Sequence, residues 1–323
     1  MRLIKTEDAV GHVLCHDMTQ IIKDQYKDAR FRKGHVVTEE DIPVLLSMGK
    51  EHLYVWEMTS GMVHENDAAE RLLALCGQEN MIRSGVKEGK IELKAACDGV
   101  FLVDSARLVA VNSQDEVMIA TRKGGMAVRE GDKLAGMRVI PLIIEEEKLR
   151  KAEQAAGDKP LLSLKPYVRK TACIVATGGE VKKGLIKDTF TPVVIDKLKT
   201  YGIETLEVVY SGDGVENVRD AVLTMREKKP DMILCTGGMS VDPDDNTPGG
   251  IKAAGADIIA YGAPVLPGAM FLLGYFDDGM PVMGLPGCVM YAGATVFDLV
   301  LPKIAADVPV TRADLAALGE GGL

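Results

Sequence analysis

The second half of the chain alternates short apolar runs with helix-length segments, and this alternation restricts the possible folds more than any other feature. The apolar runs 172–176, 205–210 and 232–235 are separated by the segments 190–200 and 215–228. Such an order forms a parallel sheet, because each helix returns the chain to the start of the next strand through a right-handed crossover. We therefore predict an α/β domain over residues 168–308, with three layers, α/β/α, and a mostly parallel sheet.

The first half has a different pattern. Strand-like runs at 100–103, 116–120 and 137–144 alternate with glycine-rich turns, and an amphipathic helix is predicted near 66–76. Residues 145–156 have the composition of a helix with charges on most faces, and the break at 157–160 ends it. We interpret residues 1–160 as a smaller α+β region that ends in a connecting helix, and residues 309–323 as a C-terminal tail.

Composition excludes several classes of function. The net charge of −9 argues against broad binding to the phosphate backbone of nucleic acid and against docking on an anionic membrane. The start of the chain has no apolar signal core, and no run approaches the roughly 18 apolar residues that span a bilayer. The six cysteines form no C-x-x-C pair, so neither a zinc site nor a disulfide framework is indicated. A cytoplasmic location is the expectation.

The third apolar run leads into a polar loop that ends at Asn246. Gly237 and Gly238 allow backbone N–H groups to approach a ligand, and Asp242, Asp244 and Asp245 provide acceptors for a metal ion or an amine. A simple turn needs fewer such residues, so a functional role is favoured. The loop suits an anionic, phosphorylated ligand held together with a divalent cation.

Two other loops are predicted to meet this one, because the carboxyl ends of neighbouring parallel strands lie at the same edge of a sheet. The first is Thr177–Glu180 with the nearby Asp188, and the second is Ser211–Gly214. Asp213 has a simpler explanation, which is to cap the helix that follows it. The sequence leaves both roles of Asp213 open.

A fourth loop follows the apolar run that ends near Leu285. Pro286 and Gly287 stand at the entrance of a predicted helical stretch, 290–301, where unpaired N–H groups bind anions. Cys288 would have its pKa lowered there by the helix dipole, and the alternative is a small buried thiol beside a tight turn. The segment with Pro267 and Gly268 is expected to line the same cleft.

Three of these motifs together resemble a known family. Thr236-Gly-Gly-Met-Ser with Asp245, then Pro267-Gly268, then Gly284-Leu-Pro-Gly287 resemble the successive signatures of the molybdopterin-binding domain shared by molybdopterin molybdotransferases and molybdopterin adenylyltransferases. The resemblance covers most of residues 168–305, and the segment 31–49 resembles a part of the molybdotransferases. It implies molybdopterin, or its adenylylated form, with Mg²⁺ and molybdate as ligands, and a homodimer as the assembly.

The resemblance also implies roles for single residues. Glu180, Asp213 and Asp245 match the family's acids and are the predicted catalytic residues, while Asp242, Asp245 and Glu180 are the predicted Mg²⁺ ligands. The predicted cofactor-binding residues are Thr177, Gly178, Gly179, Asp188, Thr236, Gly237, Gly238, Ser240, Pro267, Gly268, Pro286, Gly287 and Cys288.

Two departures from the family pattern affect the expected activity. Ala269 and Cys288 stand where the family usually has lysine and asparagine, and the missing lysine removes a positive charge that would assist molybdate transfer. Binding is therefore favoured over catalysis. Three functions stay open: molybdate transfer to the dithiolene, a non-catalytic carrier that serves a molybdoenzyme, and a nucleotide pyrophosphatase of the competence-damage-protein type.

Overall fold

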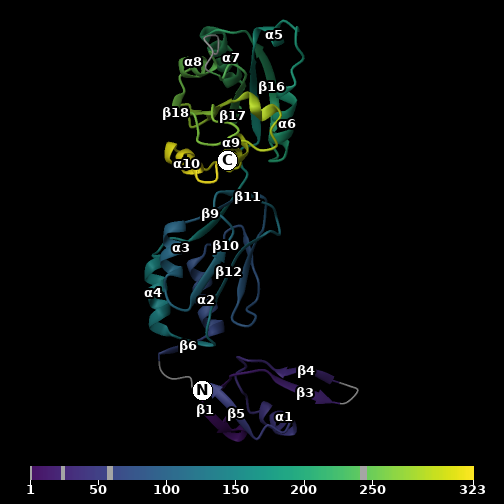
Figure 1. Ribbon diagram of the computed structural model, residues 1–323, viewed down its shortest axis with the longest axis vertical. Helices are drawn as coiled ribbons and strands as arrows, with labels where there is room; N and C mark the ends of the chain where they lie inside the picture. The colour runs from purple at the N-terminus through teal and green to yellow at the C-terminus, as the bar shows by residue number, and fades with distance from the viewer. Residues whose placement is uncertain (1, 23–25, 57–60, 241–245) are drawn as a thin grey trace. The chain divides into compact units, whose positions relative to one another are not determined.

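The structure is a computed structural model that describes residues 2–22, 26–56, 61–240 and 246–323 (Figure 1). The chain divides into two compact units. The first comprises residues 1–97, 101–124 and 129–164, and the second comprises residues 98–100, 125–128 and 165–323.

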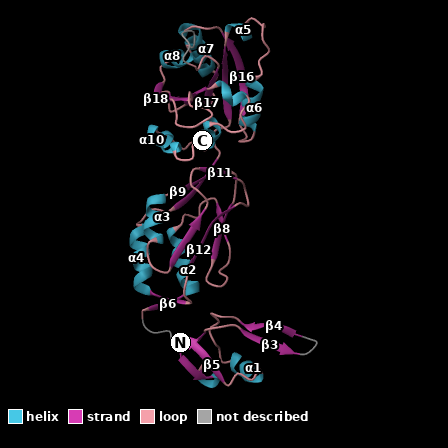
Figure 2. Ribbon diagram, in the orientation of Figure 1, coloured by secondary structure: helices cyan, strands magenta, loops and turns pink. Residues whose placement is uncertain are grey.

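The second unit contains a six-stranded sheet in the order β16-β15-β17-β20-β19-β18 (Figure 2). The strands β16, β15, β17 and β20 are parallel to one another, whereas β19 is antiparallel to both β20 and β18. The predicted α/β fold with a mostly parallel sheet is confirmed. The strands are β15 (Thr171–Thr177), β16 (Glu204–Ser211), β17 (Met232–Thr236), β18 (Asp257–Tyr261), β19 (Leu272–Tyr275) and β20 (Pro281–Leu285).

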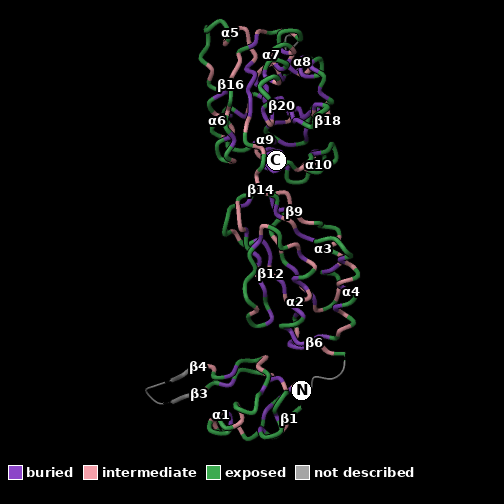
Figure 3. The backbone as a smooth tube through the Cα atoms, turned by 180° about the vertical axis from the view of Figure 1, so that it is seen from behind, coloured by how far each residue is buried: buried purple, intermediate pink, exposed green. Residues whose placement is uncertain are grey.

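Helices cover both faces of this sheet. Side chains alternate along a strand, so Ile174 packs in one apolar cluster with α6 and α9, and Val175 packs in another with α7 and α8. The central strands are buried on both faces (Figure 3), which is why they read as continuous apolar runs. The helices are α5 (Gly179–Lys182), α6 (Phe190–Lys199), α7 (Val215–Glu227), α8 (Thr247–Ala253), α9 (Val296–Ala305) and α10 (Arg312–Ala316).

The N-terminal elements are a three-stranded sheet, β1-β5-β2, with the hairpin β3-β4 and the helix α1 (Asp41–Ser47). A four-stranded sheet, β10-β12-β8-β7, follows, together with the pair β13-β6 and a three-stranded sheet, β11-β9-β14. The helices that accompany these sheets are α2 (Glu65–Leu75), α3 (Ser105–Asn112) and α4 (Glu146–Ala156). The strands are β1 (Arg2–Lys5), β2 (Val13–Leu14), β3 (Met18–Ile22), β4 (Tyr26–Phe31), β5 (His52–Trp56), β6 (Met62–His64), β7 (Met81–Arg83), β8 (Ile91–Ala95), β9 (Gly99–Val103), β10 (Val117–Thr121), β11 (Met126–Val128), β12 (Lys133–Val139), β13 (Ile143–Glu145) and β14 (Leu162–Pro166).

Two predicted helices differ from the structure. The helix α4 begins and ends almost where predicted, but it is no solvated connector, because Leu149, Ala152 and Ala156 are buried. The helical stretch predicted at 290–301 begins later, since a 3₁₀ turn at Gly287–Met290 precedes α9, which starts only at Val296. Thr295 forms a capping box with Asp298 and so fixes that start. The residues predicted as a tail include α10, whose Leu315 is buried in the core.

Candidate functional site

The carboxyl ends of the parallel strands lie in register at one edge of the sheet. Thr177 is paired with Ser211, and Thr236 is paired with both Ala176 and Leu285. The four loops that follow these strands therefore start side by side, as the sequence predicted. This edge is the candidate functional site.

Asp213 connects the first two loops. Its carboxylate Oδ2 accepts a hydrogen bond from the backbone N–H of Gly179, at 3.0 Å, and Gly178 N–H donates to the carbonyl of Ser211 at 3.2 Å. The helix that follows Asp213 begins after Gly214 and has no side-chain cap. Asp213 thus holds the loop after β15 and does not cap α7, and its catalytic role stays a prediction.

A cluster of threonines closes the third loop onto the first strand. The Thr177 hydroxyl donates to the carbonyl of Thr236 at 2.9 Å, and the Thr247 hydroxyl donates to the carbonyl of Gly237 at 2.9 Å. The two hydroxyl oxygens are 3.1 Å apart. Thr247 was not among the predicted site residues, although a hydroxyl at the first position of a helix is a common signal of a local hydrogen bond.

Gly237 and Gly238 have a packing role that the sequence did not indicate. Both have positive φ angles, +82° and +56°. A Cβ atom on Gly237 would lie 2.4 Å from the carbonyl oxygen of Thr177, and one on Gly238 would lie 2.6 Å from the Thr247 hydroxyl. The chain itself therefore fills the space that a side chain would need. That their N–H groups bind a ligand stays a prediction.

The start of the polar loop is fixed by two side chains. Met239 is buried and lies against Gly284, where a Cβ atom would be only 2.6 Å from the methionine sulfur. The Tyr261 hydroxyl donates to the Met239 carbonyl at 3.1 Å. Ser240 is exposed. The predicted acids Asp242, Asp244 and Asp245 lie outside the described residues.

Asp188 lies at the start of α6 and uses one carboxylate oxygen for the helix. Its Oδ1 accepts the N–H groups of Phe190 and Thr191, at 2.9 and 3.0 Å. Burial would raise the pKa of Asp188, but the hydrogen bonds from Thr191 and Phe190 outweigh burial and lower this pKa. Burial and the charge of Asp188 raise the pKa of Tyr210, which the sequence analysis did not single out.

The remaining predicted segments pack near the start of α9. A Cβ atom on Gly268 would lie 2.9 Å from Val296, so the Pro267–Gly268 segment is pressed against that helix. The Thr189 hydroxyl contacts the sulfur of Met290 at 3.0 Å, which brings the loop before α6 beside the 3₁₀ turn.

Of the two explanations for Cys288, the structure favours the thiol beside a tight turn over the thiol activated by a helix dipole. Cys288 lies in the 3₁₀ turn, not in the first turn of an α-helix, and burial raises its pKa. A turn of four residues carries too small a dipole to overcome the loss of solvation. The thiol therefore stays protonated near neutral pH.

Metal binding receives no support from the described part of the chain. No group of three or more His, Cys, Asp or Glu residues that could hold a metal ion is present among these residues. Glu180 is exposed in α5, and the other two predicted Mg²⁺ ligands, Asp242 and Asp245, are not described.

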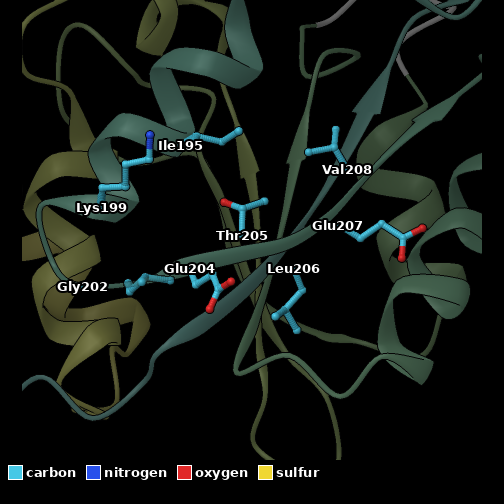
Figure 4. A pocket seen from close by; sticks show the side chains of 9 residues that line it. Ile195, Lys199, Gly202, Glu204, Thr205, Leu206, Glu207 and Val208 are labelled. Atoms are coloured by element: carbon cyan, nitrogen blue, oxygen red, sulfur yellow. The ribbon is translucent and has the colours of Figure 1, made fainter.

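A cavity of about 590 Å³ lies elsewhere in the second unit, along the edge strand β16 and the helix α6 (Figure 4). Its lining includes Ile195, Lys199, Thr205 and Leu206, and none of the predicted site residues. No helix in the described ranges is long and apolar enough to cross a membrane.

Residues 173–306 match the family model described as a probable molybdopterin binding domain. Residues 3–57 match a family described as a domain of unknown function. The chain is similar to a CinA-like protein of Mycobacterium tuberculosis, with 33% identity over 76 residues, and to one of Petrotoga mobilis, with 32% identity over 76 residues. These matches cover 24% of this chain but only 18% and 19% of the two relatives.

Among solved structures, the chain is similar to the molybdopterin biosynthesis enzyme MoaB of Thermus thermophilus, with a TM-score of 0.38 and 16% identity. That match covers 45% of this chain and 97% of the other.

Proposed function

We propose that the chain, whose residues 173–306 belong to the molybdopterin-binding domain family, binds molybdopterin or its adenylylated or molybdenum-loaded form at the carboxyl edge of its parallel strands. The observation that carries the proposal is the in-register arrangement of the loops after β15, β16, β17 and β20 within the matched residues. We further propose a role in molybdenum cofactor biosynthesis, in the cytoplasm, as a homodimer that serves a molybdoenzyme or another protein of cofactor biosynthesis.

The chain's own groups would hold the ligand mainly through backbone. The N–H groups of Gly237 and Gly238 and the exposed Ser240 hydroxyl suit the phosphate and the pterin. Thr236 is only 2% exposed, so it would position the loop instead of contacting the ligand. Asp213 would act in the same way, because one of its oxygens already holds Gly179.

Mg²⁺ is not supported by the described residues alone, and we derive no step through it. Among the described residues, Glu180 is the only predicted metal ligand, and a Mg²⁺ site takes several oxygen ligands. The proposal that Asp242 and Asp245 complete such a site is tested by calorimetric titration of the full chain with molybdopterin, with and without EDTA. Equal affinity in both titrations would exclude the metal role.

The binding proposal is tested by mass spectrometry of the small molecules that copurify with the chain, followed by titration with adenylylated molybdopterin. We expect a pterin in the native extract and saturable binding that is lost in Asp213→Ala. A preparation that neither carries a pterin nor binds one would contradict the proposal.

The nucleotide pyrophosphatase is a second candidate, favoured by the similarity to CinA-like proteins over 76 residues. Incubation with adenylylated molybdopterin or with ADP-ribose, each with Mg²⁺, separates the two functions. Release of AMP from ADP-ribose would favour the pyrophosphatase, and release from the pterin compound alone would favour cofactor biosynthesis. The carrier function predicts no release from either compound.

A further inference from the structure

The first unit contains a polar cavity of about 230 Å³ that the proposed function does not use. This volume is far above the roughly 10–15 Å³ that one water molecule requires, so a polyatomic ion fits. Its charged lining consists of three cations and three carboxylates, namely Arg32, Lys33 and Arg138 with Asp17, Glu65 and Glu88.

Packing within the first unit holds the walls of this cavity. The His64 ring nitrogen Nε2 lies 3.0 Å from the Gly34 carbonyl, and a Cβ atom on Gly34 would be 2.9 Å from Leu142. Leu142 in turn belongs to a buried apolar cluster with Val13 and Ile143. These contacts fix the backbone at Gly34 and at His64, next to the lining residues Lys33 and Glu65.

Glu65 is the most informative residue of the lining. It is 6% exposed and is the first residue of α2. Cβ atoms on Gly89 and Gly34 would lie 2.6 and 3.1 Å from its carboxylate oxygens, so the side chain is confined by backbone. No group of the described chain donates a hydrogen bond to this carboxylate, and the nearest cation, Arg138, is 3.7 Å away. A largely buried carboxylate with one long ion pair and no hydrogen bond gains from a ligand that supplies a donor.

The cations of the cavity are also incompletely paired. The Arg32 guanidinium lies 3.8 Å from Glu88, and the Arg138 guanidinium lies 3.7 Å from Glu65, both beyond hydrogen-bond distance. Arg138 Nε donates to the Val139 carbonyl, which leaves its terminal N–H groups available. Asp17, by contrast, is already engaged, because its Oδ1 accepts the backbone N–H of Lys33 at 2.6 Å.

We propose that this cavity binds a protonated phosphate group, with Arg32, Lys33 and Arg138 donating to its oxygens and Glu65 accepting the hydrogen of its P–OH. Guanidinium groups are the usual protein partners of phosphate oxygens. The carboxylate selects among oxyanions, since near neutral pH inorganic phosphate keeps a hydroxyl whereas sulfate and molybdate have none. An anion without that hydrogen would face Glu65 with like charge and leave it unpaired.

Calorimetric titration of the full chain at constant ionic strength tests the proposal, with inorganic phosphate, glycerol phosphate, sulfate and molybdate as probes. We expect phosphate to bind at least about tenfold more tightly than sulfate or molybdate, the factor that one well-made polar contact supplies. Glycerol phosphate loses its P–OH at about pH 6, so near neutral pH it should bind as weakly as sulfate does. Equal affinity for phosphate, sulfate and molybdate would overturn the assignment of Glu65.

Variants locate the binding. Arg138→Met should weaken phosphate binding by at least about tenfold, because it removes a charge-assisted contact. The matched control is Arg122→Met, which removes an exposed guanidinium paired with Asp132 in the same unit. Glu65→Gln should bring sulfate and phosphate to within about threefold of each other. If Arg138→Met unfolds, Arg32→Met replaces it, since that side chain is 57% exposed.

Unchanged phosphate affinity in both arginine variants would refute the site. The variant Asp213→Ala, in the second unit, should leave the phosphate affinity that depends on Arg138 intact. Failure of the molybdopterin proposal and failure of this one are therefore separate results.

Discussion

Glycines stand beside buried polar groups in both units, but the polar groups differ in whether they are satisfied. At the sheet edge of the second unit, Gly237 and Gly238 press against Thr177 and Thr247, whose hydroxyls donate to loop carbonyls. In the first unit, Gly34 and Gly89 press against the carboxylate of Glu65, which receives no hydrogen bond from the described residues. Hydrogen bonds within the chain stabilise a loop, whereas an acid that accepts none from the chain can accept one from a ligand.

Gly237→Ala should disrupt the contact between the loop after β17 and Thr177, and it should lower stability more than any other variant proposed here. The new Cβ atom would lie 2.4 Å from a backbone oxygen at a φ of +82°. We expect a loss of about 3 kcal/mol in the free energy of unfolding, from the clash and the backbone strain together. Denaturant unfolding measures it.

The matched control is Gly255→Ala. Gly255 has a φ of +93° but no atom within 4 Å of a Cβ position, so only backbone strain applies. Its cost should be about 1 kcal/mol. Equal losses for the two glycines would mean that the contact with Thr177 is unimportant.

Thr177→Val should have a smaller effect, because it keeps the shape and removes one hydroxyl. The Thr236 carbonyl then lacks its donor, and the expected cost is about 1 to 2 kcal/mol. Thr224→Val removes an exposed hydroxyl that donates to the Asp220 carbonyl, and it should cost under about 0.5 kcal/mol. A Thr177 variant as stable as the Thr224 variant would show that the network is not stabilising.

The pH dependence of stability in Glu65→Gln tests whether the buried carboxylate of the first unit lacks a partner. Burial raises the pKa of Glu65, although His64, Arg138 and Lys33 oppose this and Glu88 adds to it. The folded state therefore holds the proton more tightly than the unfolded state, and the wild type loses stability as pH rises from the usual glutamate range through the raised pKa. The variant should lack this decrease in a comparison of melting temperatures. Parallel pH profiles would contradict an uncompensated buried acid.

Asp245→Asn should have the smallest effect on stability and a large one on binding. Its melting temperature should stay within about 2 °C of the wild type, because asparagine keeps the size and hydrogen bonding of the side chain, while Mg²⁺-dependent binding of molybdopterin is lost. Asp242→Asn is the comparison. Loss of binding in Asp242→Asn alone would show that the wrong acid was assigned, and full binding in both would leave the loop without a functional acid.

The sequence predicted the strands that are buried on both faces, because such strands are continuous apolar runs. It missed β18 and β19. These two strands pair antiparallel, and no helix connects them, so the strand–helix alternation that revealed the other strands is absent here. It gave no bounds for α8, where Gly249 and Gly250 lower the helix propensity. Gly250 is there for packing, since a Cβ atom would lie 2.4 Å from Val218 of α7.

The two candidate sites also differ in how far the sequence could predict them. The loops of the sheet edge follow predictable strands, so their convergence could be inferred, and only the partners of single residues, such as Asp213 with Gly179, needed the structure. The phosphate cavity could not be inferred, because Arg32, Glu65 and Arg138 are far apart in the chain and share no periodic pattern. Tertiary packing alone brings these residues together.

The threonine cluster has a consequence for how a ligand would be received. Thr177 and Thr247 each carry one hydroxyl hydrogen, yet their oxygens take part in three short contacts, with the Thr236 carbonyl, with the Gly237 carbonyl and with each other. At any instant one contact lacks a hydrogen, so the two hydroxyls can exchange donors by rotating about their C–O bonds. An N–H group that donates to either carbonyl would free one hydrogen for the contact between the hydroxyls, and the loop would gain a bond without moving its backbone.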